Sequence, residues 1–309
     1  MKTRTCSRAV VVATAVLATA CSQTVAGDEA VDDVSIVICP DASADRTCKY
    51  SGLTGLQAAI DEAQQGTELR LLKGDYLASD YRDVPFQDLH VRGALVIDGK
   101  DLSIFADEGA VIRGQDDFPV SAIVIRKSMV TIEGLRIADF GYDEPEDDIY
   151  DGHGIFTIGS DVRLERVQIE GVDKMALTGR DDGKIVAHQL DIVQSHLGIW
   201  LEETASADIK NSRISGSDSA ALAIYGNASV TIRDSEIDSN EDDGLYTEDQ
   251  ARIVSLDNAL RNNTPFGARA AGESRIVICR GEMSGNAADI GQEGSGRVVI
   301  DDAEVCASS

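Results

Sequence analysis

A pattern of eight residues recurs seven times in the second half of the chain, and its regular spacing constrains the fold more than any other feature. Each copy reads apolar, any, small or apolar, any, any, variable, any, apolar. The copies begin at Val162, Ile185, Ala207, Val230, Ile253, Ile276 and Val298, so successive starts are 22 or 23 residues apart. A unit of this length cannot bury its own apolar face, so the period predicts stacked repeats that share one core.

Apolar residues alternate within each copy, as at Val230 and Ile232, and this is the period of a β-strand. Two further short strands are expected in every repeat. One is centred on Ile199, Leu222, Leu245 and Ala268, and the other on Ile169, Ile192, Ile214, Ile237, Leu260 and Met283. Glycine, serine, asparagine and aspartate separate these segments, so the sequence predicts an all-β, three-sided parallel solenoid of about 22 or 23 residues per coil. Asn240, Asn263 and Asn286 share the same spacing and predict a ladder of stacked amides.

An amphipathic helix is expected before the first coils. Thr54 and Gln57 form a capping-box pattern, and Gly66 is expected to end the helix. Its apolar face comprises Leu56, Ala59, Ile60 and Ala63. Such a helix would cover the open end of the solenoid, where core side chains and unpaired strand groups would otherwise be exposed. Less regular coils are expected at residues 69–72, 95–97, 102–104 and 130–137, which places the capped domain at residues 51–309.

The N-terminus has the pattern of an export signal. Residues 1–20 combine basic residues with an apolar run, and small residues precede Cys21. This arrangement predicts a bacterial lipoprotein with a lipid on Cys21, while ordinary cleavage nearby is the alternative. Ser22 resembles the sorting pattern for the outer membrane, so we expect a cell-envelope location and a tether over residues 21–50. No other stretch is long enough for a transmembrane helix, so membrane contact is expected through the lipid alone.

Four further cysteines remain outside the signal and the lipid site. In an exported chain they indicate two disulfides. Cys39 with Cys48 would close a loop near the start, and Cys279 with Cys306 would hold the tail on the last coils. Other pairings remain open at this point.

The charge and composition narrow the choice of partners. The formal net charge is −26, so a nucleic acid is not expected as a partner. A polyanionic glycan would be repelled unless a cation bridges it or a local basic patch overrides the negative field. Apolar residues make up 43% of the chain and aromatic residues only 5%, so the core must be aliphatic and each aromatic residue on the surface is informative.

The segments GLQAAIDEAQQGTELRLLKGDY and VIDGKDLSIFADEGAVIRG, followed by the coil repeats, resemble the pectin lyase-like group of right-handed parallel β-helices. The resemblance covers about residues 51–305 and implies that fold. It implies no single activity, because the group includes lyases, esterases, hydrolases, epimerases and proteins without known chemistry. The W-I-D-H motif of pectate lyases and the N-T-D and R-I-K elements of polygalacturonases are absent.

Side chains that point outward at equivalent positions of a solenoid form rows along its axis. The spacing places aromatic residues and carboxylates side by side in two such rows, which comprise Phe156, Trp200, Tyr246 and Arg269, and Glu202, Tyr225 and Glu248. Aromatic faces stack on sugar rings and carboxylates bond their hydroxyls, so the rows predict a carbohydrate-binding groove. The alternative is a packing surface covered by a loop.

A second set of residues could carry chemistry. His153 and Lys174 fall near equivalent positions in successive coils, and Asp151, Tyr150 and Arg180 are nearby in sequence. They supply the base, cation and acid needed to abstract a proton beside a uronate carboxylate, as a polysaccharide lyase or epimerase does. The alternative is that the histidine satisfies turn carbonyls and the lysine is a solvated charge.

The step from Val130 to Val162 is 32 residues, longer than the repeat, and the surplus is a carboxylate-rich loop at residues 141–151. We expect it to bind Ca²⁺, which takes six to eight oxygen ligands, although a solvated acidic loop is the alternative. The expected ligands are Asp143, Glu144, Glu146, Asp147 and Asp148. The sequence thus favours an envelope lipoprotein that binds a glycan, with a calcium-dependent lyase or epimerase on uronate glycans as the second hypothesis.

Overall fold

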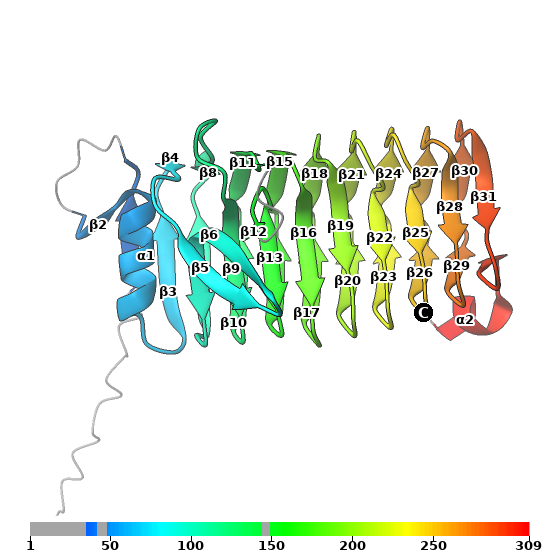
Figure 1. Ribbon diagram of the computed structural model, residues 1–309, viewed down its shortest axis with the longest axis horizontal. Coiled ribbons are helices and arrows are strands. Elements are labelled where there is room, and N and C mark those ends of the chain that lie inside the picture. Colours follow the sequence, from blue (N-terminus) through cyan, green and yellow to red (C-terminus); the bar gives the residue numbers. More distant parts are fainter. Residues whose placement is uncertain (1–34, 42–47, 144–148, 309) are drawn as a thin grey trace, which may run out of the picture. The chain divides into compact units, whose positions relative to one another are not determined.

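The computed structural model describes residues 35–41, 48–143 and 149–308. The chain divides into two units, Met1–Asp33 and Val34–Ser309, and all described residues belong to the second. They form three long sheets around one aliphatic core, with α1 (Gly52–Glu62) at one end and α2 (Ala303–Ser308) near the other (Figure 1). None of the helices in these residues is long and apolar enough to cross a membrane.

Sheet A has twelve parallel strands. In spatial order they are β2 (Tyr50–Ser51), β1 (Ile36–Cys39), β3 (Thr67–Leu71), β7 (Leu102–Ala106), β10 (Met129–Glu133), β14 (Asp161–Glu165), β17 (Lys184–His188), β20 (Ser206–Lys210), β23 (Ser229–Arg233), β26 (Arg252–Leu256), β29 (Arg275–Cys279) and β32 (Arg297–Ile300). Sheet B has nine strands. They are β30 (Glu282–Ser284), β27 (Ala259–Arg261), β24 (Glu236–Asp238), β21 (Arg213–Ser215), β18 (Asp191–Val193), β15 (Gln168–Val172), β11 (Arg136–Phe140), β8 (Ala110–Arg113) and β4 (Gly74–Leu77).

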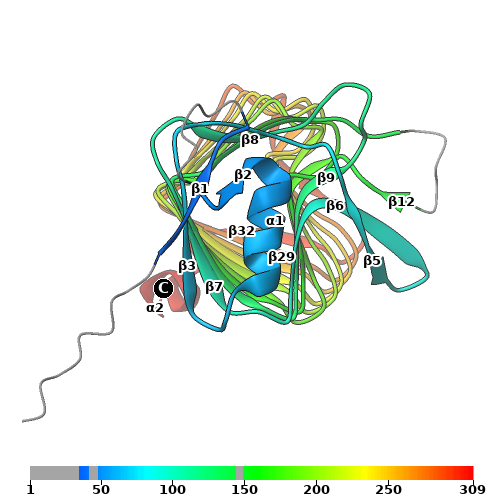
Figure 2. The same cartoon turned by 90° about the vertical axis from the view of Figure 1, so that its left-hand side faces the viewer.

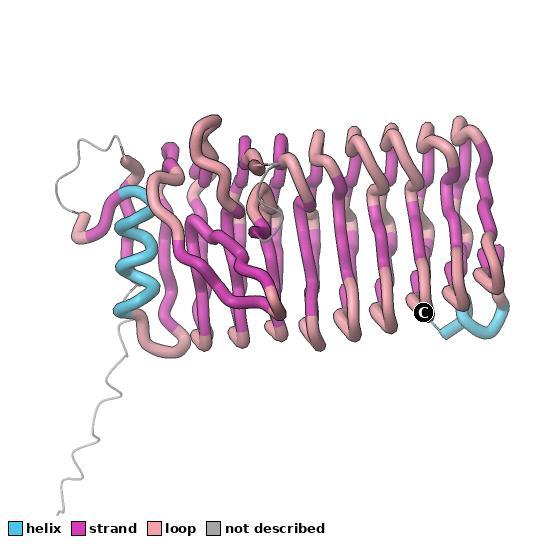
Figure 3. The backbone as a smooth tube through the Cα atoms, viewed as in Figure 1, coloured by secondary structure: helices cyan, strands magenta, loops and turns pink. Residues whose placement is uncertain are grey.

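Sheet C has eleven strands, ten of them on one parallel path. These are β12 (Ile149–Tyr150), β6 (Leu89–Asp98), β9 (Ser121–Arg126), β13 (Ile155–Ile158), β16 (Met175–Arg180), β19 (Leu197–Leu201), β22 (Leu222–Ile224), β25 (Leu245–Thr247), β28 (Phe266–Ala270) and β31 (Ala288–Gln292). The strand β5 (Arg82–Phe86) pairs antiparallel with β6 and makes a hairpin. The turns that join the three sheets stack above one another (Figure 3).

Strand pairing confirms the predicted solenoid and its register. The seven pattern starts are successive partners in sheet A, from Val162 opposite Ile185 to Ile276 opposite Val298. The amide ladder is also confirmed, since Asn240 Nδ2 donates to Asn263 Oδ1 at 2.8 Å and Asn263 Nδ2 to Asn286 Oδ1 at 3.3 Å. Buried isoleucine, leucine and valine side chains from all coils join in one cluster, which is why single coils can share a core.

The capping helix is present, but its predicted start and end were wrong. Helix α1 lies across the end of the solenoid (Figure 2) and buries Leu56 and Ile60. Its N-cap is Ser51, and Thr54 lies inside the helix. The side chain of Gln57 does not close a capping box because it is bonded to the backbone N and O of Val96, at 2.7 and 3.0 Å.

The far end of α1 is also fixed by a distant residue. The helix ends at Glu62, before the predicted Gly66. Lys100 Nζ donates to the carbonyls of Ile60 and Asp61 at 2.7 Å and of Ala63 at 3.0 Å, which satisfies groups that the end of a helix leaves free. A tertiary contact therefore replaces the expected glycine stop.

The solenoid begins earlier than expected. Strand β1 lies within the segment that we assigned to a tether, yet it pairs with β3 and buries Ile38 in the common core. Residues 21–34 and 42–47 of that segment lie outside the described residues.

Both predicted disulfides are present, Cys39–Cys48 and Cys279–Cys306, with Cα atoms 6.0 and 5.6 Å apart. The second holds α2 against the outer face of sheet A, where Val305 packs near Val277. Helix α2 begins at Ala303 and is an addition to the all-β solenoid that the repeats predicted. Disulfides persist in oxidising compartments, so these two indicate an extracytoplasmic location.

Candidate functional site

The first of the two predicted outward rows lies on sheet C. Strand pairing places Phe156, Thr178, Trp200, Ala223, Tyr246 and Arg269 opposite one another in successive coils. Tyr225 follows β22 and lies beside this row. The register predicted from the repeats is therefore correct for these side chains.

Three aromatic side chains of these coils touch one another, and we call Trp200, Tyr225 and Tyr246 the aromatic stripe. The Trp200 and Tyr225 rings stack with centres 4.4 Å apart, and the Tyr246 ring lies edge-on to Tyr225 at 5.7 Å. All three are half-buried, so each presents part of its ring to solvent. Burial raises the pKa of Tyr225 to about 12, and its phenol is therefore neutral at ordinary pH.

Carboxylates two residues further along the chain bond to two of these aromatic side chains. Trp200 Nε1 donates to Glu202 at 3.2 Å, and the Tyr246 hydroxyl donates to Glu248 at 2.7 Å. Since both carboxylates are half-buried, each keeps acceptor capacity beside an aromatic edge. This combination of apolar faces and hydrogen-bonding edges matches the two sides of a sugar ring.

Two arginines flank the stripe, and both are neutralised by acidic partners. Arg180 lies 3.2 Å from both Glu202 and Glu203. Arg269 lies over the Tyr246 ring at 4.4 Å and pairs with Asp243 and Glu293. The arginines therefore brace the stripe and add no net positive charge to it.

Phe156 has the predicted position but lies below the surface. It is 1% exposed because Phe86 of the β5–β6 hairpin and Tyr150 cover its ring, with centres 5.7 and 5.9 Å away. The packing alternative is therefore correct at Phe156, and this ring is not accessible to a ligand in the structure.

The second set of predicted residues is partly brought together. Lys174 N donates to Gly152 O at 3.0 Å, which brings Lys174 beside Gly152 and His153 of the preceding coil. The Tyr150 ring centre lies 5.8 Å from that of His153 and 5.8 Å from Lys174 Nζ. Arg180 instead faces the hairpin, 4.8 Å from the Phe86 ring centre, and forms part of the rim of the stripe.

His153 is a buried, neutral side chain. It is 2% exposed, and its Nδ1 lies 3.1 Å from the Ser121 hydroxyl. Burial lowers its pKa to about 3, so the ring is unprotonated at neutral pH. A substrate could reach it only if Tyr150 and the surrounding residues moved.

The carboxylate of Asp151 is buried in this cluster with few hydrogen-bonding partners. It is 1% exposed, and neither carboxylate oxygen has a hydrogen-bond partner within the described part of the chain. Burial raises its pKa, and the charge of Lys174 opposes that shift. Sequence alone gave no sign that this aspartate is enclosed.

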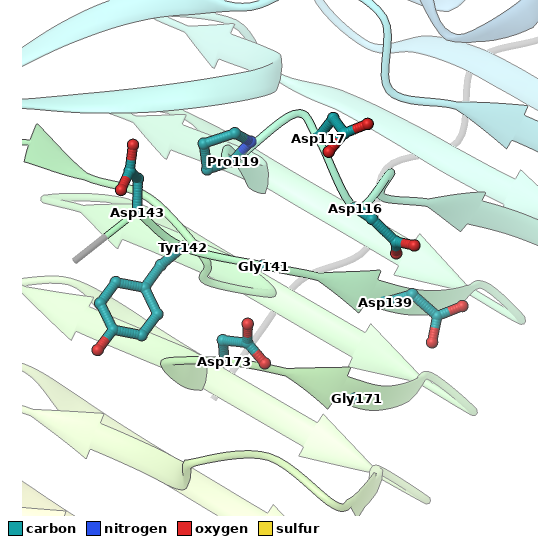
Figure 4. Close-up of a pocket in the computed structure, with 9 residues that line it drawn as sticks. All are labelled: Asp116, Asp117, Pro119, Asp139, Gly141, Tyr142, Asp143, Gly171 and Asp173. Atoms are coloured by element: carbon teal, nitrogen blue, oxygen red, sulfur yellow. The ribbon is translucent and has the colours of Figure 1, made fainter. Parts of the chain in front are cut away.

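A cavity of about 600 Å³ lies at the turns between sheets B and C (Figure 4). Its lining is mostly acidic and comprises Asp116, Asp117, Pro119, Asp139, Gly141, Tyr142, Asp143, Gly171 and Asp173. Three separate segments contribute, so no local pattern could have revealed it. Of the expected calcium ligands only Asp143 can be placed here, and residues 144–148 lie outside the described residues. Among the described residues, including those of this cavity, no group of three aspartate, glutamate, histidine or cysteine side chains is arranged to hold a metal ion.

The arrangement defines a three-sided parallel β-helix with an aromatic stripe on one outer face. A family model described as "Right handed beta helix region" matches residues 121–302, and the chain belongs to this family. A search of curated protein sequences found no match.

Solved structures show the same fold. The crystal structure of pectate lyase Pel9A has a TM-score of 0.54 at 10% identity, over 80% of this chain and 70% of that one. An alginate lyase from Paenibacillus sp. str. FPU-7 has a TM-score of 0.50 at 12% identity, over 86% of this chain and 99% of that one. At such low identity these likenesses establish the fold only.

Proposed function

We propose that this protein binds carbohydrate through the aromatic stripe on sheet C. The observation that carries the proposal is the stack of Trp200 on Tyr225 at 4.4 Å, extended by Tyr246, with all three residues half-buried. Such rings provide the apolar faces on which sugars stack, and Glu202 and Glu248 provide acceptors at their edges.

Charge narrows the class of glycan. The chain has a net charge of −26, and the two arginines of the stripe are already paired with carboxylates. We therefore expect neutral glycans to bind better than uronate polymers and nucleic acids not to bind.

A glycan array with the purified protein tests the proposal. Trp200→Ala should remove most binding, because it deletes the largest ring of the stripe. Met129→Ala is the matched control, since Met129 is 59% exposed on sheet A and away from the stripe. Equal glycan binding by the wild type and Trp200→Ala would refute the proposal.

We further propose that the protein is a cell-envelope lipoprotein anchored through Cys21. The support is the N-terminal signal pattern, and the two disulfides agree with export. Metabolic labelling with palmitate in a bacterial host should label the wild type and not Cys21→Ser. A Cys21→Ser variant that still carries the label would contradict the anchor.

A lyase or epimerase that acts on uronate glycans is the second candidate, and we expect it to require Ca²⁺. The observation in its favour is the buried Asp151 carboxylate beside Lys174, because perturbed, unpartnered groups gather at catalytic sites. Incubation with alginate or pectate and Ca²⁺ should then yield an unsaturated product that absorbs ultraviolet light, or a changed uronate epimer ratio. Lys174→Ala should abolish that product, and the absence of any product would remove this candidate.

A further inference from the structure

The β5–β6 hairpin leaves the coil path and lies on the outer face of sheet C (Figure 1). Its apolar side chains, Val84 and Phe86, are 3% and 4% exposed and pack into a cluster with Val124 and Phe156. The hairpin is therefore fixed to the face that carries the aromatic stripe, over the coils that precede the stripe.

The tip of the hairpin is tied to the first coil of the stripe. Gln87 Nε2 donates to Glu203 Oε1 at 2.7 Å, and Glu203 follows β19, the strand of Trp200. Arg180 links the two sides, because its guanidinium carbon lies 4.8 Å from the Phe86 ring centre and its Nη2 lies 3.2 Å from Glu202.

The side chains of the outward row become more exposed from Trp200 onward. Phe156 and Thr178 are 1% and 2% exposed, whereas Trp200 and Tyr246 are half-buried. Beyond Arg269 the row continues to Gly291, which has no side chain. The accessible row is thus closed by the hairpin at one end and has no such wall at the other.

The accessible row is also short. It spans three coil steps from Trp200 to Arg269, or about 14 Å at the usual spacing of strands in a sheet. A glycan that followed the rings past Trp200 would meet the buried Phe86 and the exposed Gln87 side chain, which is bonded to Glu203.

From this geometry we infer that the aromatic stripe receives the end of a glycan chain, with its terminal sugar at Trp200 against the hairpin tip. The inference rests on the proposed carbohydrate-binding function. An open groove would accept internal segments, and one long chain could then hold several protein molecules. A groove closed at Trp200 accepts one molecule for each recognised chain end.

Titration calorimetry with chains of different length tests this directly. Purified oligomers of glucose, N-acetylglucosamine and galacturonate would be used, each with about four, eight and sixteen residues. For a series that binds, we expect one protein per chain at every length. A number of proteins per chain that rises with chain length would overturn the inference and leave the proposed function intact. Absence of binding to all three series would count against both.

Opening the closed end provides a second measurement. The double variant Phe86→Ala and Gln87→Ala should let chains pass Trp200, so the number of proteins bound to each sixteen-residue chain should rise from one to two or more. Asp88→Ala is the matched control, because Asp88 is exposed at the same hairpin tip. If the double variant fails to fold, the wild-type titration still decides the question.

A bulky fluorophore attached to one chain end gives an independent check. Blocking the recognised end should reduce affinity at least tenfold, while blocking the other end should have little effect. Unchanged affinity with either end blocked would overturn the inference.

Discussion

The indole of Trp200 stacks on the ring of Tyr225 with 4.4 Å between ring centres, although the two residues belong to successive coils. Parallel coils bring side chains one repeat apart into contact, so a stripe of rings can form from residues with no local sequence relation. Most of what we propose for this protein depends on that contact.

Trp200 is the single tryptophan of the chain, so its fluorescence reports on the stripe directly. We expect a bound glycan to change its emission, and Tyr225→Ala to weaken the binding by about 0.5 to 1.5 kcal/mol, because an aromatic partner is lost. A fluorescence titration measures both. Tyr142→Ala, at an exposed tyrosine of the acidic cavity, is the control, and an equal loss of affinity in both variants would argue against the stripe.

The amide ladder should stabilise the middle coils. Asn263 is fully buried, and its amide donates to Ile237 O at 3.0 Å while its oxygen accepts from Asn240. Asn263→Ala leaves these buried groups unpaired and should lower the free energy of unfolding by about 1 to 3 kcal/mol, measured in urea. Asn286→Ala should lower the free energy of unfolding by less, because Asn286 is only half-buried. The reverse order of the two variants would contradict this account.

His153 should make the fold sensitive to acid. Its pKa is lowered from 6.5 to about 3 by burial, so between these values the unfolded chain binds a proton that the folded protein excludes. Stability from this group is therefore complete above about pH 6.5 and is lost as the pH falls toward 3. Urea unfolding at several pH values should show a smaller loss for His153→Gln than for the wild type. The exposed His90→Gln serves as control, and a slope unchanged by His153→Gln would be the contrary result.

Asp243 should make the fold less stable as the pH rises, which is the opposite of the effect of His153. It is fully buried, one of its oxygens has no partner among the described residues, and burial raises its pKa from 3.8 to about 6 despite the pairing with Arg269. The folded protein therefore holds a proton that the unfolded chain releases, so this group's stability is present below pH 4 and is lost as the pH rises through 6. Asp243→Asn should remove that part of the pH dependence in urea unfolding. The exposed Asp218→Asn should retain it, and equal behaviour of both variants would disprove the assignment.

The repeats let much of this architecture be predicted. The register from Val162 to Val298, the amide ladder and the place of Trp200 and Tyr246 in one row follow from a period that each coil repeats. The first coils are less regular, and there the expectations were less accurate. Strand β1 lay in a predicted tether, and the α1 boundaries depend on Gln57 and Lys100, which bond to residues far away in sequence.

The sequence by itself determined the β-helix and the direction of its side chains, because residues one repeat apart become neighbours when coils stack. It favoured the two disulfide pairs, and the structure decided between them and the other pairings. Only the tertiary structure decided which outward side chains remain accessible. The β5–β6 hairpin buries Phe156 and ends the accessible row at Trp200. Asp151 is buried, and so is His153, which lies against Tyr150. Turns that are distant in sequence line the acidic cavity. These features arise from packing between segments outside the repeat period, and no pattern within one coil encodes them.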